Sequence, residues 1–119
     1  MTSTIDLENE LESIHYMIED YPNDPNFICD KAIVLVKIAE KTQDKIIYYQ
    51  ALNFINQAIQ IDKKRSLFFA ERAKIHMAIG LLTEAKADVE FISTCFKEHD
   101  KLGQMYVSQI VRKVHEKII

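Results

Sequence analysis

The chain has 119 residues, a length typical of one domain, of which 48% are hydrophobic and 28% are charged. It contains only two Gly and two Pro, whereas about eight Gly and six Pro are usual at this length. Sandwiches and barrels need many turns, and phosphate-binding loops need several Gly, so the composition disfavours all of these. We therefore predict an all-α protein.

The net charge of −3 is unevenly distributed along the chain. Residues 1–30 contain eight acidic side chains and no Lys or Arg, whereas the other 89 residues have a net charge of +5. Two interpretations of the acidic end remain: a solvated surface, or a contact for a basic partner or a second copy. Nucleic-acid binding is disfavoured because the densest basic cluster, Lys63 to Arg65, contains no aromatic residue.

Other features bear on the cellular compartment. No run of 18 apolar residues occurs, so we expect no membrane-spanning helix. The acidic segment 1–12 lacks the basic start of a secretory signal. Cys29 and Cys95 are too few for a disulfide framework, and we expect both to be small core residues. Together these features predict a cytoplasmic protein.

Apolar residues recur with the 3.6-residue period of a helix along most of the chain. A first helix ends at the segment 21–25, in which Asp24 is suited to cap a second helix that begins at Pro25. This second helix runs to about residue 40 and is apolar nearly all round, so we expect neighbours on more than one side. The segment 42–44 breaks the pattern and offers caps.

Four further helices are predicted after this break. The third spans about 45–61, and the fourth spans about 67–79, with Ser66 as its cap and Gly80 placed to end it. Thr83 is expected to cap the fifth, and a sixth follows residue 100. The complete prediction is six helices joined by short connections.

Self-similarity relates these helices to one another. A shift of 34 residues superposes the third helix on the fifth: Ala51 on Ala85, Ile55 on Val89 and Ala58 on Ile92. A shift of 41 residues superposes the second helix on the fourth: Ile28 on Phe69, Ala32 on Ala73 and Leu35 on His76. Alanines at these positions allow two helices to approach closely.

This pattern resembles the tetratricopeptide repeat (TPR) family, whose 34-residue unit is a helix–turn–helix. One unit has the family's spacing throughout: Phe69, Ala73, His76, Gly80, Ala85, Val89 and Ile92. The resemblance implies an α-α superhelix of stacked helical hairpins in one domain, 1–119. Its parts are an N-terminal half repeat (1–24), a repeat with longer helices (25–63), a second repeat (66–98) and a capping helix (100–119).

Residues that could carry catalysis or bind metal are not arranged for either function. The four histidines form no HExxH motif, the cysteines form no CxxC motif, and no nucleophile elbow is present. We therefore predict no enzymatic activity, no cofactor and no metal site. His76 stands where the repeat has a packed aromatic residue, so we expect it to be buried and hydrogen-bonded.

In the TPR family the first helix of each hairpin lines a concave groove. Carried onto this sequence, the resemblance implies a partner-binding groove lined by Cys29, Ile33, Val36, Lys37, Ala70, Lys74, Met77 and Ala78. An apolar groove with lysines at its edge suits an amphipathic or partly acidic segment of another protein. The alternative is that Ile33 and Val36 belong to the core.

The predicted function is a protein–protein interaction module, or scaffold, that holds a partner peptide or helix in this groove. One alternative is a self-associating structural subunit such as a homodimer, because two and a half repeats are near the minimum for a stable stack. The other is a small TPR-type secretion chaperone, since some of those proteins are built from the same repeats and bind apolar segments.

Overall fold

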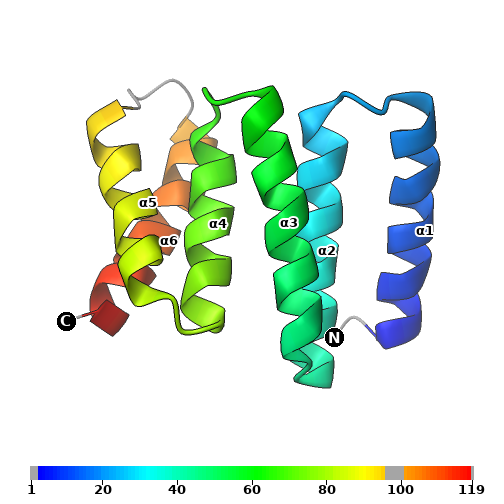
Figure 1. Ribbon diagram of the computed structural model, residues 1–119, viewed down its shortest axis with the longest axis horizontal. Coiled ribbons are helices and arrows are strands. Elements are labelled where there is room, and N and C mark those ends of the chain that lie inside the picture. The colour runs from blue at the N-terminus through cyan, green and yellow to red at the C-terminus, as the bar shows by residue number, and fades with distance from the viewer. Residues whose placement is uncertain (1–2, 96–100, 119) are drawn as a thin grey trace. The chain divides into compact units, whose positions relative to one another are not determined.

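The computed structural model describes residues 3–95 and 101–118, which are entirely helical apart from short connections. Six helices follow one another along the chain (Figure 1): α1 (Thr4–Asp20), α2 (Pro25–Thr42), α3 (Lys45–Ile61), α4 (Ser66–Ala78), α5 (Leu82–Cys95) and α6 (Lys101–Ile118). The predicted all-α class is therefore confirmed, and the predicted third helix has the bounds of α3. The core role predicted for Cys95 concerns a side chain outside the described set.

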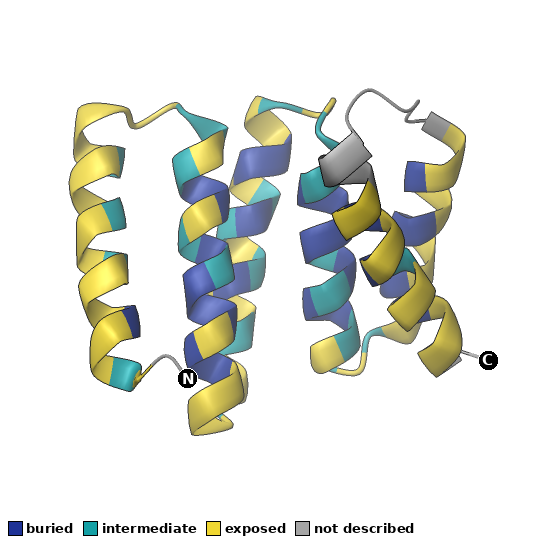
Figure 2. Cartoon of the chain, turned by 180° about the vertical axis from the view of Figure 1, so that it is seen from behind, coloured by how far each residue is buried: buried dark blue, intermediate teal, exposed yellow. Residues whose placement is uncertain are grey.

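The chain divides into two compact units, residues 1–63 and residues 64–119, each with three helices. The division falls where the first full repeat is predicted to end. In the first unit, α2 lies between α1 and α3 and contacts both of them (Figure 1). It buries eight residues, whereas α1 buries only Leu7, so most of α1 is exposed (Figure 2). The expectation that the second helix has neighbours on more than one side is confirmed.

Local capping interactions set the ends of the helices in the first unit. Asp24 accepts a hydrogen bond from the backbone N–H of Asn26 at 2.9 Å, with Pro25 in the first turn of α2. Gln43 adopts a left-handed conformation (φ 57°) that ends α2, and Asp44 then caps α3 through the N–H of Ile46 at 3.0 Å. The caps predicted at Asp24 and in 42–44 are therefore confirmed.

In the second unit, α4 pairs with α5, and α6 contacts both of them (Figure 2). Gly80 ends α4 with φ 84°, and the N–H of Leu81 donates to the carbonyl of His76 at 2.8 Å. A second bond joins the N–H of Gly80 to the carbonyl of Met77 at 3.1 Å. These two bonds form a Schellman motif, the helix ending for which glycine is suited.

Two predicted caps in this unit are wrong, Ser66 by one residue and Thr83 by two. The carbonyl of Arg65 accepts from the N–H of Phe68, so α4 begins at Ser66 itself, without a side-chain cap. The carbonyl of Leu81 accepts from the N–H of Ala85 at 3.0 Å, so Thr83 lies inside the first turn of α5. Arg65 therefore occupies the cap position of α4, where its side chain makes no capping hydrogen bond, and Leu81 directly precedes α5.

The small residues of the repeat pattern are completely buried in the two helix pairs. Ala32 and Ala51 belong to the pair α2–α3, and Ala73 and Ala85 belong to the pair α4–α5; all four are 0% exposed. The other superposed positions are also buried, among them Ile28, Ile55, Phe69 and Val89. Over residues 3–95 and 101–118, no helix combines the length and the apolar character needed to cross a membrane.

Candidate functional site

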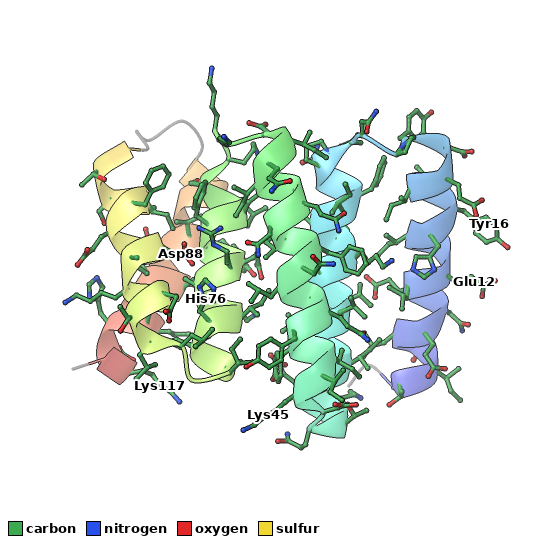
Figure 3. All side chains as sticks on the ribbon, viewed as in Figure 1. Glu12, Tyr16, Lys45, His76, Asp88 and Lys117 are labelled. Carbon is green, nitrogen blue, oxygen red and sulfur yellow. The ribbon has the colours of Figure 1, made fainter. Side chains whose placement is uncertain are left out.

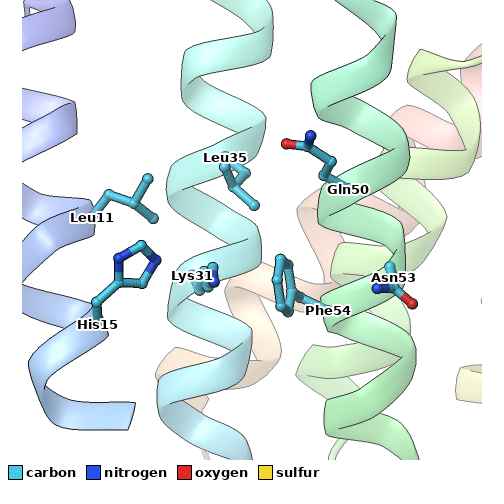
Figure 4. Close-up of a pocket in the computed structure, with 7 residues that line it drawn as sticks. All are labelled: Leu11, His15, Lys31, Leu35, Gln50, Asn53 and Phe54. Carbon is cyan, nitrogen blue, oxygen red and sulfur yellow. The ribbon is translucent and has the colours of Figure 1, made fainter. Parts of the chain in front are cut away.

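The first unit contains a hollow of about 400 Å³ between its three helices (Figure 4). Each helix contributes a pair of residues four positions apart, which places both members on one face of that helix. The lining consists of Leu11 and His15 from α1, Lys31 and Leu35 from α2, and Gln50, Asn53 and Phe54 from α3. In each pair one residue is polar and the other is apolar, so the lining of the hollow is partly polar and partly apolar.

Lys31 is the one lining residue with a permanent charge near neutral pH. Its Nζ lies over the ring of Phe54, 4.0 Å from the ring centroid, a geometry that allows a cation–π interaction. Partial burial lowers the pKa of Lys31 because it penalises the charged form. Among the residues that the structure describes, no carboxylate forms an ion pair with this ammonium group.

The other polar side chains of the hollow are also available to a ligand. His15, Gln50 and Asn53 have no side-chain hydrogen bond to any other described residue. Leu35 and Phe54 provide apolar surface beside them (Figure 4). The arrangement can therefore bind an amphipathic group through apolar contact, one cation and several hydrogen-bonding side chains.

The predicted groove residues of α2 lie elsewhere. At 100° per residue, Cys29, Ile33, Val36 and Lys37 occupy the side of α2 opposite to the hollow. Cys29 and Val36 are buried, Ile33 is half-buried, and Lys37 is exposed. None of the four lines the hollow. Their role in partner binding stays a prediction.

The other four predicted groove residues belong to α4 in the second unit. Ala70 is buried, Lys74 and Met77 are half-buried, and Ala78 is exposed. The predicted set is therefore shared between two units, whereas the hollow lies wholly within one. No sequence pattern singled out the hollow, because polar and apolar residues four positions apart occur on several faces of these helices.

A second group of polar side chains joins α4 to α5 (Figure 3). Asp88 is 3% exposed and accepts two-pronged hydrogen bonds from the guanidinium of Arg72, at 2.7 to 3.2 Å. The same carboxylate lies 2.9 Å from Nδ1 of His76, which is 8% exposed. The prediction of a buried, hydrogen-bonded His76 is confirmed. These contacts saturate the Asp88 carboxylate, so we assign the group a structural role.

Another buried polar contact joins α4 to α6. The hydroxyl of Tyr106 donates to Oε1 of Glu71, which is 1% exposed. Oε2 of Glu71 is buried and has no hydrogen-bond partner among the described residues. No three His, Cys, Asp or Glu side chains converge on a metal-sized site within the described part of the chain. A scan against protein-family models and a search of curated proteins found no match for the sequence.

Proposed function

We propose that this chain is a non-enzymatic protein–protein interaction module that holds a peptide or helix of a partner protein in the hollow of α1, α2 and α3. The observation that carries the proposal is that the hollow contains an unpaired lysine and three polar side chains without partners. His15, Gln50 and Asn53 are exposed, so water occupies their hydrogen-bonding positions until a ligand replaces it. A site where several are left available, next to exposed apolar surface, is suited to a ligand.

We further propose that the helix pairs α2–α3 and α4–α5 are TPR-like repeats and that the protein acts in the cytoplasm. The burial of the superposed residues supports the repeat. Positions 34 residues apart in the pairs α2–α3 and α4–α5, such as Ala51 with Ala85 and Ile55 with Val89, have the same buried character. A repeat of structure as well as of sequence is what stacked helical hairpins require.

A matched pair of variants tests the location of the site. Gln50→Trp places a bulky side chain at the hollow, whereas Asn9→Trp places it at an exposed position on α1 that does not line the hollow. A partner is first identified by proximity labelling in the native cell and then purified. We expect Gln50→Trp to weaken its binding by about tenfold or more, and Asn9→Trp to change it by less than about twofold.

The groove predicted from the sequence is the competing location for the partner-binding site. If Lys74→Glu combined with Ile33→Asp abolishes binding while Gln50→Trp leaves it intact, the partner uses the predicted groove and the hollow is the wrong site. If the native cell gives no partner whose binding the purified chain reproduces, the interaction function itself is rejected.

A second candidate function, a self-associating structural subunit, is favoured by the opposite charges of the two units. Residues 1–63 contain eleven acidic and five basic side chains, and residues 64–119 contain seven acidic and ten basic ones. Unlike charges attract copies of the chain at low salt. Light scattering decides this: a mass that exceeds 13.9 kDa at low salt and returns to it at high salt supports self-association.

A further inference from the structure

We propose that the hollow selects its partner by a single carboxylate: an apolar side chain of a partner helix packs against Leu35 and Phe54, while an Asp or Glu of the same helix pairs with Lys31. This inference rests on the proposed function and specifies the chemistry of the partner. The ammonium group of Lys31 lies in the hollow and forms no ion pair with a carboxylate of the described residues.

The surroundings of Lys31 favour an incoming anion. Partial burial removes some of the water around this ammonium group and so lowers the pKa of Lys31, and no described carboxylate forms an ion pair with it. The Phe54 ring, 4.0 Å from Nζ, replaces only part of that hydration and holds the side chain in the hollow. A carboxylate that enters the hollow completes the ion pair in a partly desolvated place, where such a pair is stronger than on an open surface.

The other lining residues of the hollow suit the apolar and hydrogen-bonding side chains of such a helix. Leu11, Leu35 and Phe54 provide the apolar contact, and a volume of about 400 Å³ lies within the range of ordinary ligand sites. On the α3 side, Gln50 and Asn53 are neutral and can donate or accept hydrogen bonds. This wall therefore tolerates either sign of charge on the partner.

Exposed carboxylates of α1 disfavour a run of acidic residues on the partner. At 100° per residue, Glu8, Glu12 and Glu19 follow His15 around the exposed side of α1. Glu12 projects away from the neighbouring helix (Figure 3), and none of the three forms an ion pair with a described residue. These glutamates do not line the hollow, but they would repel a run of acidic residues on a partner beside α1 and attract Lys or Arg on that flank.

Three synthetic amphipathic helices of about 18 residues test the inference. The first has Leu residues and one central Glu on its apolar face, with Lys on one flank. The second has Gln in place of that Glu, and the third has Glu in place of the flanking Lys. Each is titrated into the isotope-labelled full chain, and binding is followed by the NMR shifts of the hollow residues.

We expect the single-Glu peptide to bind about five to ten times more tightly than the Gln peptide at low salt, and the third peptide to bind more weakly than the first. Lys31→Met keeps most of the apolar stem and should remove the preference for Glu over Gln. Lys31→Arg should retain the preference for Glu, because it keeps the positive charge, and would thereby show that the site is intact. Lys41→Met, at an exposed position in the last turn of α2 that does not line the hollow, is the matched control and should retain that preference too.

Equal binding of the Glu and Gln peptides overturns the inference, as does a preference that survives Lys31→Met. Binding of no peptide up to about 1 mM also overturns it. None of these results decides the proposed function, because that function is tested separately with the native partner and the variant Gln50→Trp. Loss of the native partner's binding in Gln50→Trp, combined with equal binding of the two peptides, would keep the hollow as the site and reject only its selection by a carboxylate.

Discussion

Asp88 shows how a single side chain can hold two helices together. Its carboxylate receives Arg72 and His76, both from α4, so one residue of α5 is bonded twice to the neighbouring helix. The side chain of Asp88 is almost fully buried, whereas that of Arg72 is 24% exposed. A buried carboxylate is tolerated only with such partners, because an unpaired one would lose its hydration without compensation.

We expect Asp88→Asn to destabilise the protein by about 2 kcal/mol, because it leaves the guanidinium of Arg72 without its counter-charge and disturbs the bond to His76. The free energy of unfolding is measured in urea. Glu90→Gln is the control: Glu90 lies on the same helix, is exposed and has only a 4.0 Å contact with Lys86. A loss in the control equal to that in Asp88→Asn would contradict the structural role of the cluster.

Asp30 should make stability depend on pH. Burial, followed by repulsion from Asp24 and Glu10, raises the pKa of Asp30 above its ordinary value of 3.8. Its contribution to stability is therefore fully present below that ordinary value and is lost as the pH rises through the raised pKa. We expect Asp30→Asn to raise the Tm near pH 7, with the gain disappearing at acidic pH.

The control for Asp30→Asn is Glu12→Gln, at an exposed position on the acidic helix α1. Removing this charge should raise the Tm less than Asp30→Asn does. A gain for Asp30→Asn that is the same at acidic and neutral pH would show that titration of this carboxyl is not the cause.

At the scale of the elements, the ends of the helices depend on a few residues with special backbone or capping properties. Asp24 and Asp44 satisfy free N–H groups at the starts of α2 and α3. Gln43 and Gly80 adopt the left-handed conformation at the ends of α2 and α4. These are local interactions, and each involves residues within a few positions in the sequence.

Gly80→Ala should destabilise the protein by about 1 kcal/mol. A Cβ at this position meets no atom within 4 Å, so the cost comes only from the positive φ of 84° and not from crowding. Gly80→Asn should be less destabilising than Gly80→Ala, because asparagine tolerates the left-handed conformation better. Thermal unfolding of both variants checks this. Equal Tm values for the wild type and Gly80→Ala would contradict the prediction.

At the scale of the whole molecule, each of the two compact units has a buried core of its own. The first buries Ile28 and Ile55 among others, and the second buries Phe68 and Val89. A unit of about 60 residues buries a smaller share of its surface than the whole chain and is correspondingly less stable. The units also differ in sign of charge, which distinguishes the surfaces that they offer to partners.

We expect the fragments 1–63 and 64–119 each to be helical in isolation, with a lower Tm than the full chain. Circular dichroism and thermal unfolding measure this. The control is a cut after Gln43, which separates α2 from α3 within one unit, and its N-terminal fragment 1–43 should have little helical structure. Equal helical content for the fragments 1–43 and 1–63 would contradict the independence of the units.

The sequence by itself determined the all-α class, the number of helices and most of their ends. These features depend on composition, on the 3.6-residue period and on local residues such as Asp24 and Gly80. It also predicted the burial of His76 and of the alanines at the helix crossings, because the repeat pattern marks those positions. The two caps that it misplaced, Ser66 and Thr83, depend on how the preceding turn enters each helix.

Only the tertiary structure decided which side of α2 lines a hollow. This helix is apolar nearly all round, so its period does not indicate which side its neighbours cover. The packing of α1 and α3 against it leaves Lys31 and Leu35 to line the hollow, whereas Cys29 and Val36 lie on the opposite side of α2. That no described carboxylate forms an ion pair with Lys31 is likewise a property of three helices together, because it depends on which side chains the other two bring near it.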